Sequence, residues 1–225
     1  MGEFMRSEKR LLSSVSMWSA DLSALGASMR AMEPYADSFH FDLMDAHFTP
    51  NLLFGPDTIR SLRPLSKKPF EAHLMMTNPE TMLAPLSEAG TNIIILQPET
   101  CDVAGLAVRI RALGCRPGIA ISAAMPVPEV EEFLELLDIV VVMGTELGIK
   151  GAGLMPEALN KIACLRSIID HKNLPLMIEA DGGIRRHTVQ QLYRAGADII
   201  VPGSLAFGPD PKEVFEYLWS LRPSE

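Results

Sequence analysis

The segment "AGADIIV" at residues 195–201 has a counterpart earlier in the chain, "AGTNIIIL" at residues 89–96. In both segments a helical pattern ends at a glycine, two residues follow, and a run of aliphatic residues begins. Glycine is typical of a helix end because it adopts the left-handed backbone conformation at little steric cost. Each segment therefore predicts the same local unit: the end of a helix, a tight turn and a buried strand.

The same unit recurs along the whole chain. Apolar or β-branched runs predict strands near residues 15–19, 38–43, 69–76, 92–96, 117–121, 138–143, 175–180 and 198–202. Helical periodicity follows each run, near residues 24–34, 56–64, 79–89, 102–113, 127–137, 156–170, 186–195 and 211–221. Alternation of this kind indicates a parallel sheet, and eight units in 225 residues indicate a (β/α)8 TIM barrel. An open, doubly wound sheet is less favoured, because no G-x-G-x-x-G pattern follows the first strand.

We predict one domain over residues 1–225, with residues 1–13 as a flexible N-terminal extension or in part a remnant of cloning. A net charge of -8 and a pI of about 5.2 argue against nucleic acid and against an anionic membrane as partners. Three cysteines without a metal-like pair favour a reduced, cytoplasmic protein. No apolar run approaches the ~18 residues of a membrane span, and the first residues lack the apolar core of a signal peptide.

Polar residues fall at the predicted carboxyl ends of the strands, where barrels of this kind carry their chemistry. Ser19 ends the first strand, His40 and Asp42 the second, His73 the third, Asp181 the seventh, and Gly203 and Ser204 the eighth. His40 and Asp42 stand two residues apart, so both side chains point to one face of the strand. We therefore expect a polar cluster inside the mouth of the barrel.

Two imidazoles and two carboxylates in this cluster suit one divalent metal ion per chain, such as Zn, Fe, Mn or Co. Without a counter-charge, burial of two carboxylates would cost several kcal/mol each. Taken singly, each histidine is better explained as a hydrogen-bonded core residue, and the "DGG" at 181–183 as a turn. Their coincidence favours a metal site at His40, Asp42, His73 and Asp181, with Glu179 as a supporting neighbour and Asp45 and His47 as structural loop residues.

Six motifs in order resemble the ribulose-phosphate 3-epimerase family over nearly the whole chain. They are "SAD" (19–21), "HFDLMDAHFTPN" (40–51), "HLM" (73–75), "VM" (142–143), "DGGI" (181–184) and "GSLAFG" (203–208). The resemblance implies the same barrel, the same four metal ligands, and Asp42 and Asp181 as the catalytic acid–base pair. It also implies substrate contacts at Ser19, His73, Gly148, Gly151, Gly182, Gly183, Gly203 and Ser204, and methionines lining the reacting plane at Met44, Met75 and Met143.

The chemistry implied by this resemblance is inversion at C3 of a phosphorylated ketose, a small phosphorylated sugar. A metal would stabilise the enediolate, and two carboxylates on opposite walls would exchange the proton on the two faces. Ribulose 5-phosphate is the default substrate, and a hexulose or tetrulose phosphate is the variant. Assembly as a homo-oligomer, a dimer or a hexamer, is implied in the same way.

Four positions depart from the family pattern, and one of them, Ala46 in place of a glycine in the loop after the second strand, is a tolerated loop change. Lys150 stands in place of a glycine and Ala152 in place of a glutamine in the sixth loop, while Gln97 replaces a histidine after the fourth strand. Lysine adds a point charge where glycine offers only its amide, and glutamine offers an amide to a substrate hydroxyl. We therefore predict that Lys150 and Gln97 mark a substrate other than ribulose 5-phosphate.

Two alternatives stay open. A phosphate-barrel decarboxylase would need an Asp-x-Lys-x-x-Asp array, and "DLMD" at 42–45 has no lysine. A non-catalytic sugar-phosphate binder would keep the barrel, but it has no need of two opposed carboxylic acids.

Overall fold

The structure, a computed structural model, describes residues 10–221. Its sheet closes on itself, because the strand order runs β1-β9-β8-β7-β6-β5-β4-β2 and β1 also pairs with β2. All pairings in this ring are parallel. The strands are β1 (Leu12–Ser16), β2 (Ser38–Asp45), β4 (Phe70–Met75), β5 (Ile93–Leu96), β6 (Arg116–Ile121), β7 (Ile139–Met143), β8 (Met177–Asp181) and β9 (Ile199–Val201). The predicted (β/α)8 barrel is confirmed.

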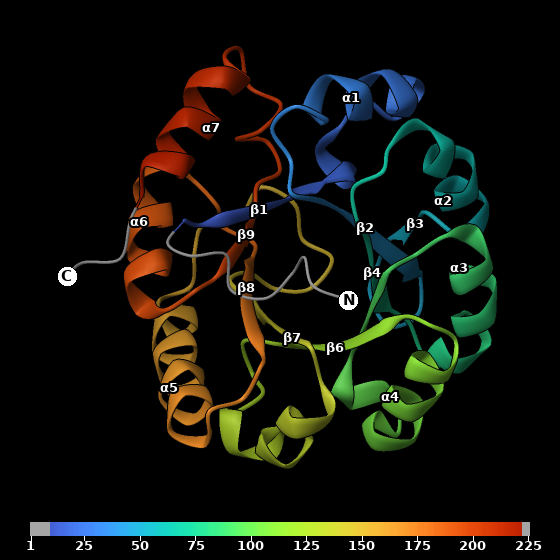
Figure 1. The fold of residues 1–225 in the computed structure, drawn as a ribbon, viewed down its shortest axis with the longest axis vertical. Helices are drawn as coiled ribbons and strands as arrows, with labels where there is room; N and C mark the ends of the chain where they lie inside the picture. The colour runs from blue at the N-terminus through green and yellow to red at the C-terminus, as the bar shows by residue number, and fades with distance from the viewer. Residues whose placement is uncertain (1–9, 222–225) are drawn as a thin grey trace.

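Helices surround the barrel (Figure 1). They are α1 (Leu25–Met32), α2 (Pro56–Leu62), α3 (Leu83–Ala89), α4 (Val103–Ala112), α5 (Pro156–Lys172), α6 (Arg186–Ala195) and α7 (Pro211–Ser220). Each buries one apolar stripe; in α4 the buried residues Val103, Leu106 and Ile110 follow the three- and four-residue spacing of a helix face. Every helix within residues 10–221 is too short or too polar to cross a lipid bilayer.

The first strand lies nearer the N-terminus than its predicted range of 15–19. Leu12 and Ser13 pair with Ile199 and Ile200 of β9, so they belong to the barrel and not to the predicted extension over residues 1–13. The strand was misplaced because it is rich in serine, whose side chains are buried here through hydrogen bonds. For example, Ser14 Oγ donates to Glu71 at 2.6 Å. The part of the predicted extension at residues 1–9 lies outside the described residues.

The predicted helix at 127–137 also differs, because two 3₁₀ segments replace it, Val127–Glu129 and Glu131–Leu136. The buried residues Val127, Val130, Leu134 and Leu137 keep the three- and four-residue spacing that predicted the helix, and they still face the core. The backbone closes three-residue turns there instead, with Val130 N–H donating to Val127 O and Leu137 N–H to Leu134 O.

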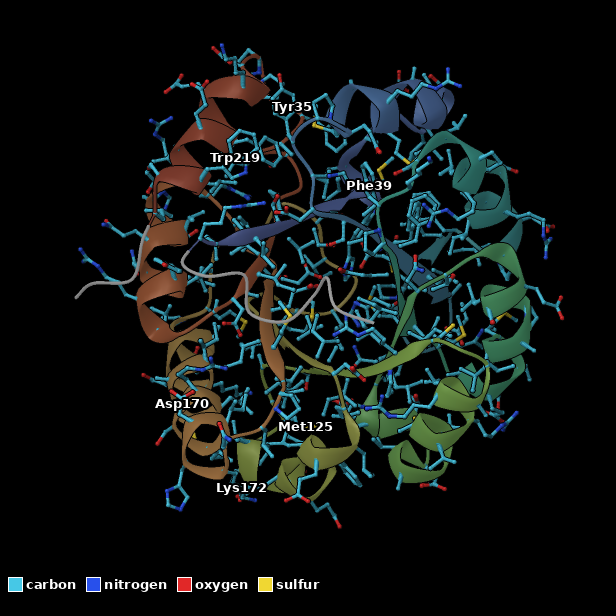
Figure 2. The ribbon with its side chains drawn as sticks, viewed as in Figure 1. Tyr35, Phe39, Met125, Asp170, Lys172 and Trp219 are labelled. Carbon is cyan, nitrogen blue, oxygen red and sulfur yellow. The ribbon has the colours of Figure 1, made fainter. Side chains whose placement is uncertain are left out.

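Alternation along the strands separates two environments. Phe39, Phe41 and Leu43 of β2 point outward into the core between barrel and helices, where Phe39 meets Phe70 edge to face (Figure 2). The inward residues of the other half of the barrel are mostly apolar and form a second cluster, Ile93, Ile95, Ala120, Ile139, Val141, Met143, Met177 and Ile199. The inward positions of β2, β4 and β8 carry histidine and carboxylate instead. The site therefore occupies one side of an otherwise apolar barrel.

Tyr35, which follows α1, closes the outer ring by packing against α7. Its ring stacks on Phe215 at 5.3 Å between centroids and lies 6.3 Å from that of Trp219 (Figure 2). The first and last helical units are thereby joined, and the barrel that carries the site is covered at the seam between its two ends.

Candidate active site

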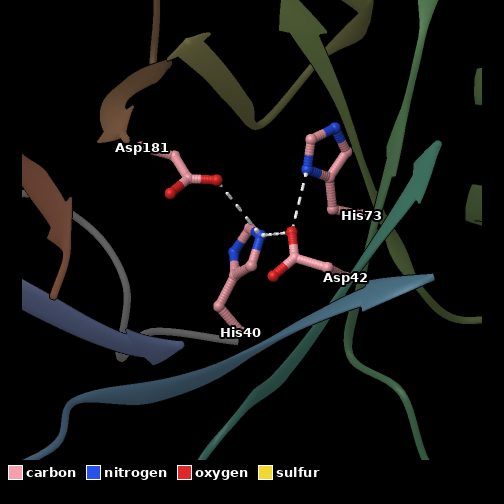
Figure 3. Close-up of side chains that lie close together, drawn as sticks. All are labelled: His40, Asp42, His73 and Asp181. Carbon is pink, nitrogen blue, oxygen red and sulfur yellow. Dashed lines mark ion pairs between the residues drawn. The ribbon is translucent and has the colours of Figure 1, made fainter. Parts of the chain in front are cut away.

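Four polar side chains converge inside the barrel (Figure 3). The ladder between β2 and β4 sets Asp42 beside His73, and Asp181 comes from the end of β8. His40 Nε2 lies 3.5 Å from Asp42 Oδ1 and 3.8 Å from Asp181 Oδ2. His73 Nδ1 lies 3.6 Å from Asp42 Oδ1. The predicted cluster is thus formed by tertiary contact between three strands.

The four residues fit a divalent metal ion by their donor atoms and their burial. One ligand atom from each lies within 4.8 Å of the others. His40 and His73 are fully buried, yet within residues 10–221 neither His40 Nε2 nor His73 Nδ1 has a hydrogen-bond partner. Buried polar atoms are normally satisfied, so unpartnered nitrogens aimed at carboxylates are an arrangement that a cation completes.

His40 is held from behind by two further carboxylates. Its Nδ1 lies 3.4 Å from Glu71 Oε2 and 3.2 Å from Glu179 Oε1, and both glutamates are fully buried. A ligand histidine usually gives its second N–H to such an acceptor, which fixes the ring. Glu179 stands where the sequence placed it. Glu71 was missed, although its position two residues before His73, on the same face of the strand, was a usable signal.

His73 is held from behind by Gln97, at the end of β5. With its amide oriented to satisfy both ends, Gln97 Oε1 accepts a hydrogen bond from His73 Nε2 at 2.7 Å. Gln97 is fully buried and does not line the cavity described below. The prediction that Gln97 offers its amide to a substrate hydroxyl is therefore wrong, because the side chain points to the imidazole instead.

Burial and nearby charges give the two aspartates different pKa values. Burial raises the pKa of Asp181 to about 6, because the carboxylate loses its hydration and the neighbouring histidines offset only part of that effect. Burial is also the largest single influence on Asp42 and acts in the same sense, but the charges and hydrogen bonds of His40 and His73 together outweigh it and hold the pKa of Asp42 well below its usual range. Burial together with Glu71 raises the pKa of Glu179 to about 8. Asp42 is therefore the stronger acid of the pair.

A cavity of about 200 Å³ opens onto Asp42 and Asp181. Met75 and Met143 line it, while Met44 and His73 are not among the described residues in its wall. His73 thus lies where it can hold a metal and is turned away from a substrate. The cavity wall includes every other predicted substrate residue, Ser19, Gly148, Gly151, Gly182, Gly183, Gly203 and Ser204.

Two of these glycines are required by close packing. Gly183 has φ +70°, and a Cβ there would lie 2.5 Å from Leu154 Cα, so the loop after β8 passes directly under the sixth loop. A Cβ at Gly203 would lie 2.5 Å from Ser19 Oγ. Glycine lets the backbone approach the cavity at both places, so its amides are available to an anion such as a phosphate.

The sixth loop, residues 144–155, is fixed by contacts from three other loops. Asn51 Nδ2 donates to Gly148 O at 2.6 Å, and Lys150 Nζ donates to Trp18 O at 2.8 Å. Arg185, which also lines the cavity, donates to Gly151 O at 3.2 Å. The sequence missed Arg185, and its place directly after "DGGI" was the only signal. Lys150 and Arg185 together bring positive charge to the mouth of the cavity.

Asp45 fixes the rim as a structural residue. Its carboxylate accepts hydrogen bonds from the backbone N–H groups of His47 and Phe48 at 2.9 Å each, and from that of Thr77 at 2.8 Å. The loop after β2 is thereby joined to the loop after β4. Ala46, which replaces a glycine of the family pattern, has a left-handed φ of 58° in this turn.

Fold and site together define a (β/α)8-barrel protein with a buried His₂Asp₂ centre below a glycine-rich mouth. In overall fold it is similar to 3-keto-L-gulonate-6-phosphate decarboxylase from Vibrio cholerae, with a TM-score of 0.70 and 14% identity over 93% of this chain and 95% of that one. A mutant tryptophan synthase α-subunit from Pyrococcus furiosus gives a TM-score of 0.66 and 14% identity, over 93% and 96% of the two chains. At this identity the likeness concerns the fold alone.

Comparison with known sequences shows which family of (β/α)8-barrel proteins the chain resembles. The model of the ribulose-phosphate 3 epimerase family matches residues 13–207. The ribulose-phosphate 3-epimerase of a Synechocystis species is 35% identical over 203 residues, 88% of each chain. That of Escherichia coli K12 is 32% identical over 216 residues, 94% of this chain and 96% of its own. The chain belongs to the ribulose-phosphate 3-epimerase family and is an isomerase, an epimerase that acts on carbohydrates.

Proposed function

We propose that the protein is a metal-dependent 3-epimerase of a phosphorylated ketose, with Asp42 and Asp181 as its two proton-transfer groups. One observation carries this proposal: two carboxylates from different walls of the barrel face the same cavity, beside two histidines whose free nitrogens are buried. In barrel order β1 and β9 separate the strands that bear Asp42 and Asp181. A group held between them presents one face to each carboxylate.

His40, Asp42, His73 and Asp181 would hold the metal. When bound, a divalent cation would act as a Lewis acid and stabilise the negative charge that develops on the ketose oxygens when the C3 proton leaves. Glu71 and Glu179 keep His40 oriented, and the closed barrel keeps the centre away from bulk water. The chain thus places its charges before the substrate arrives.

Inversion at C3 requires that a proton leaves one face and that a proton returns to the other. One carboxylate removes the C3 proton, and the second, protonated, delivers its own proton to the opposite face; the reverse reaction exchanges the roles. The stereochemistry therefore depends on both residues.

The phosphate would bind at the mouth, against the amides of Gly182, Gly183 and Gly203 and beside Ser204. Lys150 and Arg185 add charge that attracts a dianion. Ribulose 5-phosphate is the first substrate to test, since the relatives carry its name, and tetrulose and hexulose phosphates are the alternatives that the altered sixth loop favours.

A cytoplasmic location and assembly as a dimer or hexamer stay predictions. Cys101, Cys115 and Cys164 are free thiols, which fits a reducing compartment.

The test is proton NMR in D₂O with ribulose 5-phosphate and with four- and six-carbon ketose phosphates. With metal-loaded protein, the C3 signal of the true substrate should disappear as the second epimer forms. Protein treated with a chelator should be much slower, and added metal should restore the rate. Exchange at C3 at the same rate before and after chelation would contradict metal dependence. A substrate that binds without any exchange would favour the non-catalytic binder.

A decarboxylase is the less favoured enzyme. The positions between Asp42 and Asp45 are Leu43 and Met44, so no lysine stands there to protonate a carbanion. A separate NMR sample with a keto-acid phosphate, 3-keto-L-gulonate 6-phosphate, would test it, because a decarboxylase would release the carboxyl group as carbon dioxide and leave a sugar phosphate one carbon shorter.

A further inference from the structure

We infer that Gln97 is a positioning residue: it fixes the protonation of the His73 ring so that Nδ1 is always free to hold a metal ion. This inference rests on the metal site of the proposed function and adds a residue to it. It also gives a role to a departure from the family pattern that the sequence had connected with substrate choice.

The contacts of Gln97 leave its amide one satisfactory orientation. Oε1 accepts from His73 Nε2 at 2.7 Å, while Nε2 donates to Ala120 O and to Glu99 Oε2, each at 3.1 Å. In the opposite orientation the amide N–H groups would face the imidazole nitrogen, and the amide oxygen would face two acceptors. Since Gln97 is fully buried, water cannot compensate for that mismatch.

This orientation decides which nitrogen of His73 carries the proton. An amide oxygen can only accept, so His73 Nε2 must be protonated to form the 2.7 Å contact. The neutral ring then has an unprotonated Nδ1. That atom lies 3.6 Å from Asp42 Oδ1 and has no hydrogen-bond partner among the described residues. A metal ligand needs this lone pair, and Gln97 keeps it available.

The two histidines are therefore supported by different chemistry. His40 is backed by the carboxylates of Glu71 and Glu179, whereas His73 is backed by a neutral amide. A further carboxylate directly behind His73 would join the four carboxyl groups that the centre already buries, and each burial has a desolvation cost. A histidine there could present either an N–H or a lone pair to His73. Glutamine, held at its other end by Ala120 and Glu99, presents only the acceptor.

The experiment measures the ring and the metal separately. Metal-free wild-type protein labelled with ¹⁵N-histidine is examined by long-range ¹H–¹⁵N NMR, with His73 assigned by comparison with His73→Ala. The expected result is a ring protonated at Nε2. A ring protonated mainly at Nδ1 would overturn the inference, and this readout needs no Gln97 variant to fold.

Zinc affinity is then measured by chelator competition for wild type, Gln97→Met and Gln97→Glu. Gln97→Met, which has no amide acceptor, should bind zinc about 10- to 100-fold more weakly, as is typical when a ligand histidine loses its support. Gln97→Glu restores an acceptor for His73 Nε2 but must be protonated to donate to Ala120 O or Glu99 Oε2, so it should recover part of the loss. Thr100→Val is the matched control, because Thr100 donates to the backbone oxygen of Gln97 in the same turn and does not touch the ring.

These measurements test the role of Gln97 separately from the metal site of the proposed function. If wild type and His73→Ala bind zinc equally, the metal site itself is wrong, and the inference falls with it. If His73→Ala loses zinc while Gln97→Met binds it as tightly as wild type, only the role of Gln97 is wrong. Thermal melting of the metal-free variants shows whether a lost affinity reflects unfolding; a Gln97→Met protein that melts like Thr100→Val but binds weakly supports the inference.

Discussion

The centre and the mouth of the site are built in different ways. The residues of the centre lie on strands. His40, Asp42 and His73 are at most 4% exposed, and neighbouring strands pair with the backbones of His40 and His73 on both sides. The mouth stands on loops, where Ile149 is 43% exposed and single side-chain contacts hold the sixth loop. The four ligand positions of the centre keep the family pattern, with Gln97 as a departure behind His73, whereas Lys150, Ala152 and Ala46 depart from it in loops. Under the proposed function, rigid strands would carry the reaction and adaptable loops the choice of substrate.

The largest effect should come from the centre. Asp42→Asn and Asp181→Asn should each lower turnover by about 10²–10⁴-fold, because each removes one of two proton-transfer groups while keeping the shape of the side chain. The measurement is kcat for epimerisation, together with exchange of the C3 proton of each epimer in D₂O. Near-normal epimerisation by both variants would show that the two aspartates are not the acid–base pair.

A substitution at the rim of the barrel should lower the stability of the protein. Asp45→Ala removes the acceptor for three backbone N–H groups and should lower the free energy of unfolding by about 1 kcal/mol at pH 7, after allowance for solvent screening. Burial is the largest single influence and raises the pKa of Asp45, but the hydrogen bonds together outweigh it and lower the pKa in the folded state. Its contribution is thus complete above the unfolded pKa, about 4, and is lost as the pH falls through the lower folded value.

Urea melts of wild type and Asp45→Ala at pH 7 and at successively lower pH measure this difference, which should shrink on acidification. Asp57→Ala is the control, since the side chain of Asp57 is 96% exposed and its loss should change stability little. A difference that grows toward acid pH would mean that Asp45 is not held as a carboxylate.

A substitution in the sixth loop should change the preference of the protein among ketose phosphates. Lys150→Gly removes the bond to Trp18 and a charge at the cavity, and should change the ratio of kcat/KM between ribulose 5-phosphate and the four- or six-carbon ketose phosphates by about fivefold, the range of an exposed ion pair. Lys172→Ala, on α5, is the control for loss of charge alone. Preference for ribulose 5-phosphate by about a hundredfold, unmoved by Lys150→Gly, would end the idea of a different substrate.

The smallest effect is expected at Ala46. Its φ of 58° is costly for a residue with a β-carbon, so Ala46→Gly should relieve about 1 kcal/mol of strain. Roughly half of this gain is lost to the greater freedom of glycine in the unfolded chain, which leaves a net stabilisation of about 0.5 kcal/mol. Paired thermal melts measure it, and a destabilised Ala46→Gly protein would show that the turn is not strained.

Local sequence patterns were sufficient for the architecture. Strand and helix periods, with glycine at the helix ends, predicted the barrel, and two-residue spacing in "HFD" (40–42) predicted that His40 and Asp42 share a face. The hydrophobic pattern misplaced the first strand, because polar residues are buried in it. The serines of β1 are buried because other strands supply their hydrogen-bond partners, and no local pattern reports a partner 57 residues away, as for Ser14 and Glu71.

The sequence by itself predicted the class of fold and the four residues of the centre, because these depend on period, spacing and residue type, and its resemblance to a known family implied the glycines of the mouth. Only the tertiary structure added Glu71 to Glu179 behind His40, and placed Gln97 against His73 and away from the cavity. The reason is physical. The direction of a side chain at a strand end depends on which atoms of neighbouring strands can satisfy it, and those strands meet only when the barrel closes.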